Sequence, residues 1–309
     1  MAFKYINPGY ANLLDTGTGT AVEGAQYSRS DKTVRDAKHS KTGVSFWMPK
    51  IRGIAVPYTL TELYGKFDVY LKSGKSLDST AWFQFGEKNK VEISGYRDHW
   101  SVYGANSNTS YFDTRKMKLD DVNTIWFHMK QGLNYDAMLH VIVNGHEIGK
   151  KTDLYMDFRE AKKISIYADT DDALLSNIIL SDEDINMKEQ AVLLSVQSTV
   201  TDMTDGGDGS YRATAAGQQI LQTMDTAVLA EAYGADSQVT GVTLFGAPAY
   251  RTGTGICTLT ALEDVSGAMT EHGRHELTDK TTALVWDGHG ASFSMAEMEA
   301  RKFGWKAGE

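Results

Sequence analysis

The residues of this sequence best suited to chemistry lie between positions 96 and 111, where aromatic rings are mixed with amides, acids and bases. The members of this group are Tyr96, Arg97, Asp98, His99, Trp100, Tyr103, Asn106 and Tyr111. Proteins bind sugars with such residues, because the C–H faces of a sugar stack on rings while its hydroxyls meet polar side chains. We therefore predict a ligand-binding site here. The pattern also fits a core strand followed by an ordinary loop, or an interface with another protein.

Acidic residues near position 170 predict a second kind of site. Asp169, Asp171 and Asp172 could offer carboxylate oxygens to Ca²⁺, which prefers hard oxygen ligands. The same residues would equally suit a solvated turn before a strand. No other cofactor is predicted.

Motifs of well-known catalytic centres were sought and none was found. There is no Gly-x-Ser-x-Gly, and His272, His275 and Glu276 lack the spacing of a His-Glu-x-x-His zinc site. The contiguous acids Asp182-Glu183-Asp184 would point to alternate faces of a strand, which suits a helix N-terminus better than a catalytic pair. We therefore assign no catalytic residue and predict that the chain is not an enzyme.

The elements that would position these residues are strands. Apolar residues alternate with polar ones in several short runs between Leu63 and Ser181, as in Phe67, Val69 and Leu71. The dipeptide Asn144-Gly145 predicts a tight turn after one of these runs, because both residues tolerate positive φ. At least eight such strands predict a mainly β protein with a two-sheet sandwich.

The rest of the chain has a different texture. Residues 1–40 are predicted to form an N-terminal arm, residues 41–190 the sandwich, and residues 191–309 a small α+β domain for attachment or oligomerisation. Short helices are expected from Ser181 to Gln190 and from Thr226 to Tyr233, and a final one begins at Ser294 and ends at Gly304. Ser294 and Glu297 have the spacing of a capping box.

Composition excludes several classes of function. The formal net charge of −9, with no cluster of Lys and Arg, predicts that nucleic acid is not a partner. No apolar run approaches the roughly 20 residues of a membrane span. A single cysteine and the lack of a signal peptide predict folding in a reducing cytosol. A homo-oligomer is compatible with all of this.

Four strand motifs carry a family resemblance: residues 64–70, 124–129, 139–145 and 175–183. They resemble the core strands of the concanavalin A-like lectin/glucanase superfamily, and within it the laminin G-like jelly-roll domains of phage and prophage structural proteins. The resemblance covers about residues 40 to 190. It implies carbohydrate or surface binding more often than catalysis, and the Glu-x-Asp-x-Glu string of the superfamily's glucanases is absent here.

The resulting functional prediction is a non-enzymatic phage or prophage virion protein. It would be made in the bacterial cytoplasm and exposed on the particle, where its lectin-like domain binds a cell-surface glycan or another ligand. Two alternatives remain open. One is a purely structural role in contact with other virion proteins, and the other is a glycan-degrading enzyme on a jelly-roll fold.

Overall fold

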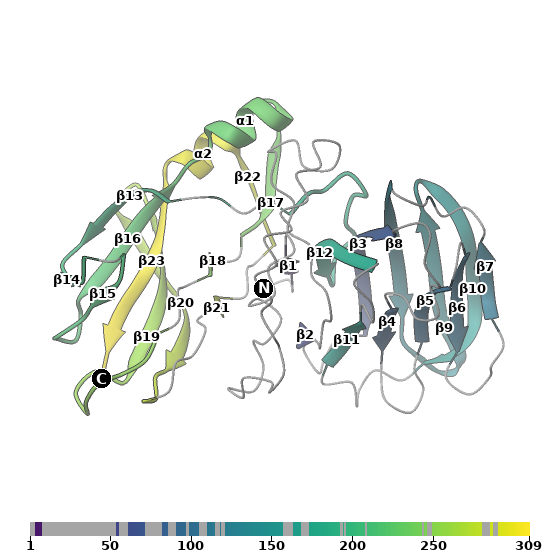
Figure 1. Cartoon of the computed structure of the whole chain (residues 1–309), viewed down its shortest axis with the longest axis horizontal. Coiled ribbons are helices and arrows are strands. Elements are labelled where there is room, and N and C mark those ends of the chain that lie inside the picture. The colour runs from purple at the N-terminus through teal and green to yellow at the C-terminus, as the bar shows by residue number, and fades with distance from the viewer. Residues whose placement is uncertain are drawn as a thin grey trace. The chain divides into compact units, whose positions relative to one another are not determined.

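A computed structural model describes most of residues 121–309 and, before them, mainly isolated strands. The described residues are 4–7, 54–55, 61–71, 82–85, 91–96, 99–104, 110–114, 118, 121–156, 163–167, 173–191, 194, 196–207, 209–242, 244–245, 249–279, 285–286 and 290–309. The chain divides into two compact units, Met1–Val192 and Leu193–Glu309 (Figure 1). Most of the predicted arm, residues 1–40, lies outside the described residues.

Unit 1 contains two antiparallel six-stranded sheets. The first sheet has, in spatial order, β1 (Lys4–Asn7), β12 (Ala173–Ser181), β3 (Glu62–Leu71), β8 (Asp121–Lys130), β9 (Gly132–Val143) and β10 (His146–Met156). The second has β2 (Ile54–Ala55), β11 (Lys163–Tyr167), β4 (Trp82–Phe85), β5 (Val91–Tyr96), β6 (His99–Gly104) and β7 (Ser110–Thr114). The predicted mainly β sandwich is confirmed.

The first sheet packs one face into the core of the sandwich. Phe67 of β3 lies opposite Ile125 of β8, and Phe127 lies opposite Val141 of β9. All four side chains are almost fully buried, as the period-two alternation predicted. Gly65 is required beside them, because a Cβ at this position would lie 1.9 Å from the ring of Phe127.

The turn between β9 and β10 also follows the sequence. Asn144 has φ 52° and Gly145 has φ 79°, which are the left-handed conformations that the dipeptide predicted. The Asn144 side chain accepts a hydrogen bond from the Thr124 amide at 3.0 Å, and its amide nitrogen donates to Asn123 at 2.8 Å. These bonds join the turn to β8.

The predicted helix from Ser181 to Gln190 is wrong. Residues 182–191, here called the strap, form bends and a turn without regular helix. The strap lies on the outer face of the first sheet, where Ile185 is buried against Trp126 and Ile179. Tertiary contacts with this apolar patch outweigh the helix-capping potential of the acids in the strap.

Unit 2 is built around one five-stranded antiparallel sheet. Its spatial order is β13 (Val196–Thr201), β16 (Gln219–Met224), β23 (Arg301–Gly308), β19 (Thr258–Val265) and β20 (Ala268–Glu276). Three two-stranded ladders pair β14 (Thr204–Asp205) with β15 (Tyr211–Arg212), β17 (Gln238–Gly241) with β22 (Gly290–Ser294), and β18 (Leu244–Phe245) with β21 (Val285–Trp286). The helices are α1 (Ala227–Tyr233) and α2 (Met295–Glu299). Because these helices are short, the α+β class of this unit stays a prediction.

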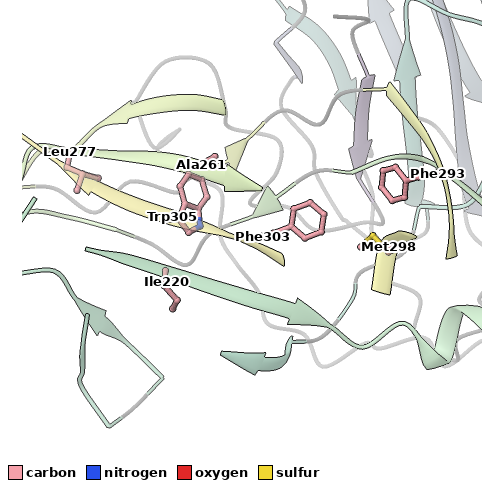
Figure 2. Close-up of a cluster of buried hydrophobic side chains, with 7 residues drawn as sticks. All are labelled: Ile220, Ala261, Leu277, Phe293, Met298, Phe303 and Trp305. Carbon is pink, nitrogen blue, oxygen red and sulfur yellow. The ribbon is translucent and has the colours of Figure 1, made fainter. Parts of the chain in front are cut away.

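The core of unit 2 gathers on one face of that sheet. Figure 2 shows Phe303 and Trp305 projecting from β23, with Met298 of α2 close to Phe293. Trp305 lies opposite both Ile220 of β16 and Ala261 of β19. The central strand therefore supplies the large rings of this core.

The final helix is shorter than predicted. The capping box is confirmed, since Ser294 accepts from the Glu297 amide while Glu297 accepts from the Ser294 amide. The chain then turns into β23, so Gly304 lies within a strand and does not end a helix. A Cβ on Gly304 would lie 1.7 Å from the carbonyl oxygen of Ile220, and glycine is therefore needed for close strand pairing.

None of the helices in the described ranges is both long and apolar enough to cross a membrane.

Candidate functional site

The sequence-predicted ligand site falls on β5, β6 and β7, where the structure describes only the backbone. Tyr96 ends β5 and lies directly opposite His99 at the start of β6. Trp100 and Tyr103 lie on β6, and Tyr111 lies on β7. Arg97, Asp98 and Asn106 lie outside the described residues. The ligand-binding role of this group stays a prediction.

The predicted calcium ligands Asp169, Asp171 and Asp172 also lie outside the described residues. Across the part of the chain that the structure does describe, no three or more His, Cys, Asp or Glu side chains come together as a metal site. The Ca²⁺ site stays a prediction.

A different group of rings meets on the outer face of the first sheet in unit 1. This ring cluster consists of Tyr64 on β3, Trp126 and His128 on β8, and His140 on β9. The register places Tyr64 opposite His128, and His128 opposite His140. The three residues therefore form one row across three neighbouring strands. This row runs perpendicular to the strands, so it is invisible in any single strand segment.

The rings of the cluster touch one another. Tyr64 and His128 stack, with ring centroids 3.9 Å apart and planes 12° from parallel. Trp126 meets His140 edge to face, with centroids 5.4 Å apart, and lies 6.4 Å from His128. Such contacts hold each ring in one orientation, with its edge beside the neighbouring ring.

Each histidine of the cluster is paired with a carboxylate. The Nε2 of His128 lies 2.7 Å from Oε1 of Glu62, which also accepts from the Tyr64 hydroxyl at 3.2 Å. The Nε2 of His140 lies 2.9 Å from Oε2 of Glu147. A carboxylate at Nε2 fixes the orientation of an imidazole.

The cluster is only partly covered. The side chains of His128 and His140 are 15% and 18% exposed, while those of Glu62 and Glu147 are 38% and 62% exposed. Trp126 is almost fully buried beneath the strap. The two histidine–carboxylate pairs therefore lie at an accessible surface, and the Trp126 indole is buried next to them.

Negative charge shapes the environment of Tyr64. Burial raises the pKa of its hydroxyl, and Glu62 raises it further by its charge and its hydrogen bond. The charge of Asp184 in the strap acts in the same direction. Tyr64 is therefore a neutral hydrogen-bond donor near pH 7.

The strap is fixed to the sheet by buried polar residues beside the cluster. Lys66 is fully buried, and its Nζ donates to the carbonyl oxygen of Glu189. Asn177 accepts from the Ala191 amide at 2.7 Å and donates to Asp68 at 2.8 Å. The Trp126 indole donates to the carbonyl oxygen of Ile185 at 2.9 Å. These bonds fix the strap along one side of the ring cluster.

Asn177 of β12 links the strap to the first sheet. It has a positive φ of 52° at the point where the pairing of β12 with β3 shifts register. Both ends of its amide are used to hold Asp68 and the strap.

Sequence reasoning missed the ring cluster although every member lies in a recognised strand motif. The alternation assigned Phe127 and Met129 to the core, which leaves Trp126 and His128 on the outer face. The available signal was the alternation along each strand, which also places Tyr64 and His140 on the outer face. Without the strand order and register, nothing in the sequence shows that those outward residues share a row.

The arrangement can support two kinds of chemistry. Ring edges and faces beside hydrogen-bonding groups suit a sugar, which presents both C–H surfaces and hydroxyls. A histidine oriented by a carboxylate at a partly exposed surface also suits proton transfer. Both kinds of chemistry require the same accessible face.

Comparison with known proteins finds no matching family model and no match among curated proteins. Solved structures that are similar include the alginate lyase Aly36B, with TM-score 0.32 and 15% identity over 41% of this chain and 72% of that one. The galectin LEC-6 of Caenorhabditis elegans has TM-score 0.33 and 10% identity over 44% of this chain and 94% of that one. Domain 4 of AbnA, a GH43 extracellular arabinanase from Geobacillus stearothermophilus, has TM-score 0.33 and 15% identity over 46% and 71%.

The two six-stranded sheets of unit 1 carry the predicted β-sandwich, whereas the concanavalin A-like superfamily and the phage origin stay predictions. The prediction that the chain is not an enzyme is contradicted, because alginate lyases stand among the similar structures together with galectins. The missing Glu-x-Asp-x-Glu string excluded one catalytic arrangement, and a jelly roll can carry others.

Proposed function

We propose that unit 1 is a carbohydrate-active domain that binds a glycan across the ring cluster. The observation that supports this proposal most directly is the row of Tyr64, His128 and His140 on neighbouring strands, with Trp126 beside it. Two strand spacings separate the ends of the row, or about 10 Å. This span is comparable to a disaccharide.

The polar groups around the row would fix the orientation of the sugar. Glu62 and Glu147 offer carboxylate oxygens to hydroxyls, and each is already held by a histidine. Because the strap is anchored by buried bonds, the site would be largely formed before a ligand arrives. A preformed site loses less conformational entropy on binding.

A glycan array with the full chain tests the binding proposal. The informative variant is His128→Ala with His140→Ala, because both side chains are partly exposed and neither belongs to the buried core. The matched variant is Trp100→Ala with Tyr103→Ala, which removes rings from the other sheet of the sandwich. We expect loss of binding in the first variant and retention in the second.

The reverse pattern would move the site to the group first predicted from the sequence. Folding of each variant is checked by circular dichroism. Running the array with Ca²⁺ and with EDTA tests Asp169, Asp171 and Asp172 at the same time.

The second candidate function is cleavage of the bound glycan, and the His128–Glu62 pair favours it. With Nε2 held by the carboxylate, the other ring nitrogen would exchange a proton with the substrate. Glu62→Gln and His128→Gln should then abolish release of shorter products while weakening binding far less. Unchanged product release in both variants would remove this pair from any reaction.

Placement in a phage particle rests on the sequence resemblance alone. On that basis we propose that the chain is a virion component made in the bacterial cytoplasm, with unit 2 serving attachment or oligomerisation. Contact with other virion proteins is the alternative use of the same surfaces. Mass spectrometry of purified particles from a producing strain tests the placement, and its absence from them would refute it.

A further inference from the structure

Carboxylates lie beside the rings of the cluster. Glu62 lies within hydrogen-bonding distance of both Tyr64 and His128, and Glu147 has the same relation to His140. Asp184 adds its negative charge near the Tyr64 hydroxyl. A ligand placed on the row would therefore meet the carboxylates of Glu62 and Glu147.

Positive charge on this face is less well placed. Lys66 is fully buried and its Nζ is held by the Glu189 carbonyl, with Asp68 nearby. Lys130 lies opposite Glu62, and Lys150 lies opposite His140. Both of these lysines are exposed, as is Glu147, so water screens all three charges, whereas Glu62 is partly covered and paired with His128.

The described elements that form this face contain no arginine. None of β3, β8, β9, β10 or the strap contains an arginine. The planar guanidinium is the protein group that best matches a carboxylate or sulfate, through two parallel hydrogen bonds. A site built for an acidic sugar chain would be expected to use it.

We infer that the ring cluster takes a glycan without carboxylate or sulfate groups, either neutral or bearing amino groups, and discriminates against polyuronates. This inference rests on the proposed glycan-binding function. Hydroxyl and ammonium groups can donate to Glu62 and Glu147, whereas a uronate carboxylate can only accept and would repel them. Electrostatic repulsion of this kind is a common basis of specificity.

Matched pairs of oligosaccharides test the inference directly. Each pair has the same linkage and length and differs only at C6: glucan with glucuronan, mannan with polymannuronate, and galactan with polygalacturonate. We expect the neutral member of the bound pair to bind about tenfold or more tightly than its uronate at low salt. The difference should shrink as salt rises, because exposed charges are screened.

The decisive variant is Glu62→Gln, which removes one negative charge and keeps an oxygen acceptor for Tyr64 and His128. We expect it to bring the two affinities closer by strengthening uronate binding. The control is Asp121→Asn, which removes the same charge at the far end of β8, about 23 Å from His128 along the strand. This control should leave the difference unchanged.

The possible outcomes distinguish failure of the inferred selectivity against uronates from failure of the proposed glycan binding. A uronate that binds as well as its neutral partner, and is lost in the His128→Ala, His140→Ala variant, would overturn the inference and leave glycan binding in place. An equal effect of Glu62→Gln and Asp121→Asn would overturn it as well. Binding of no member of any pair would refute both.

Discussion

Lys66 is the residue whose replacement tests most directly how the strap is held. Its side chain is fully buried, and burial lowers its pKa, although the charges of Asp68 and Glu189 act in the opposite direction. Lys66→Met keeps the length of the side chain and removes the ammonium group. The Glu189 carbonyl then loses its donor, at a cost of about 1–3 kcal/mol.

Asp68 adds to this cost because it is also buried. It keeps hydrogen bonds from Thr124 at 2.7 Å and Asn177 at 2.8 Å, but it loses the neighbouring positive charge. Removing one member of a contacting buried ion pair costs about 3–5 kcal/mol, whereas Lys66 acts on Asp68 only through its charge. With two bonds remaining, we expect a total near 3 kcal/mol, which is roughly a 100-fold change in an equilibrium constant.

Hydrogen exchange of the full chain, followed by mass spectrometry of peptides from the strap, measures this effect. The Ala191 amide is the reporter, because it donates to Asn177 and is released when the strap opens. We expect its protection to fall by roughly 100-fold in Lys66→Met. Peptides from β19 and β23 in unit 2 provide the internal control.

The double variant Lys66→Met, Asp68→Asn is the matched comparison. An asparagine amide can accept from Asn177 and donate to the Thr124 hydroxyl, so no buried charge remains unpaired. We expect it to recover the part of the loss that comes from the Asp68 charge, and to keep the cost of about 1–3 kcal/mol at the Glu189 carbonyl, which still lacks its donor. The reasoning is refuted if the single variant keeps full protection, or if the double variant is less stable than the single one.

The pH dependence of the same exchange tests the lowered pKa of Lys66. Because the pKa of Lys66 is lowered in the folded state, the unfolded chain binds more protons as pH approaches 10.5, and stability rises over that window. Lys66→Met should lack this rise.

Three further predictions concern other parts of the fold. Gly65→Ala should destabilise unit 1 by about 3 kcal/mol or more in urea unfolding, because its Cβ would overlap the Phe127 ring, and an unchanged midpoint would contradict this packing. Ser294→Ala should cost about 1 kcal/mol by the loss of the bond to the Glu297 amide, measured by exchange in α2, whereas Ser294→Thr should cost less. Because the pKa of Tyr64 is raised, its contribution to stability should fall as pH rises beyond 10, so the wild type should lose stability relative to Tyr64→Phe over this range; parallel curves for the two proteins would show that the folded hydroxyl titrates normally.

Several elements followed from local sequence because their causes are local. The Asn144-Gly145 turn depends on two residues that tolerate positive φ. The capping box at Ser294 depends on a spacing of three residues. Core strands such as that of Ile125 and Phe127 depend on parity, which any segment displays by itself.

Two predictions from local patterns were wrong for the same reason. The acids after Ser181 favoured a helix, yet Trp126 and Lys66, which come from other strands, hold the strap in a non-helical conformation. The sequence from Ser294 to Gly304 favoured one long helix, yet β23 is the central strand of unit 2 and pairs on both sides. Contacts distant in sequence outweigh propensities worth only tenths of a kcal/mol per residue.

Apolar alternation and turn residues were sufficient to predict the class of the protein, a mainly β chain with a sandwich. The position of a site required the order and register of the strands. Tyr64, His128 and His140 are spread over more than 70 positions, and their row exists because the order of β3, β8 and β9 and their register bring them together. Parity along a strand is a local property, whereas the neighbour across a sheet is chosen by the packing of the whole domain.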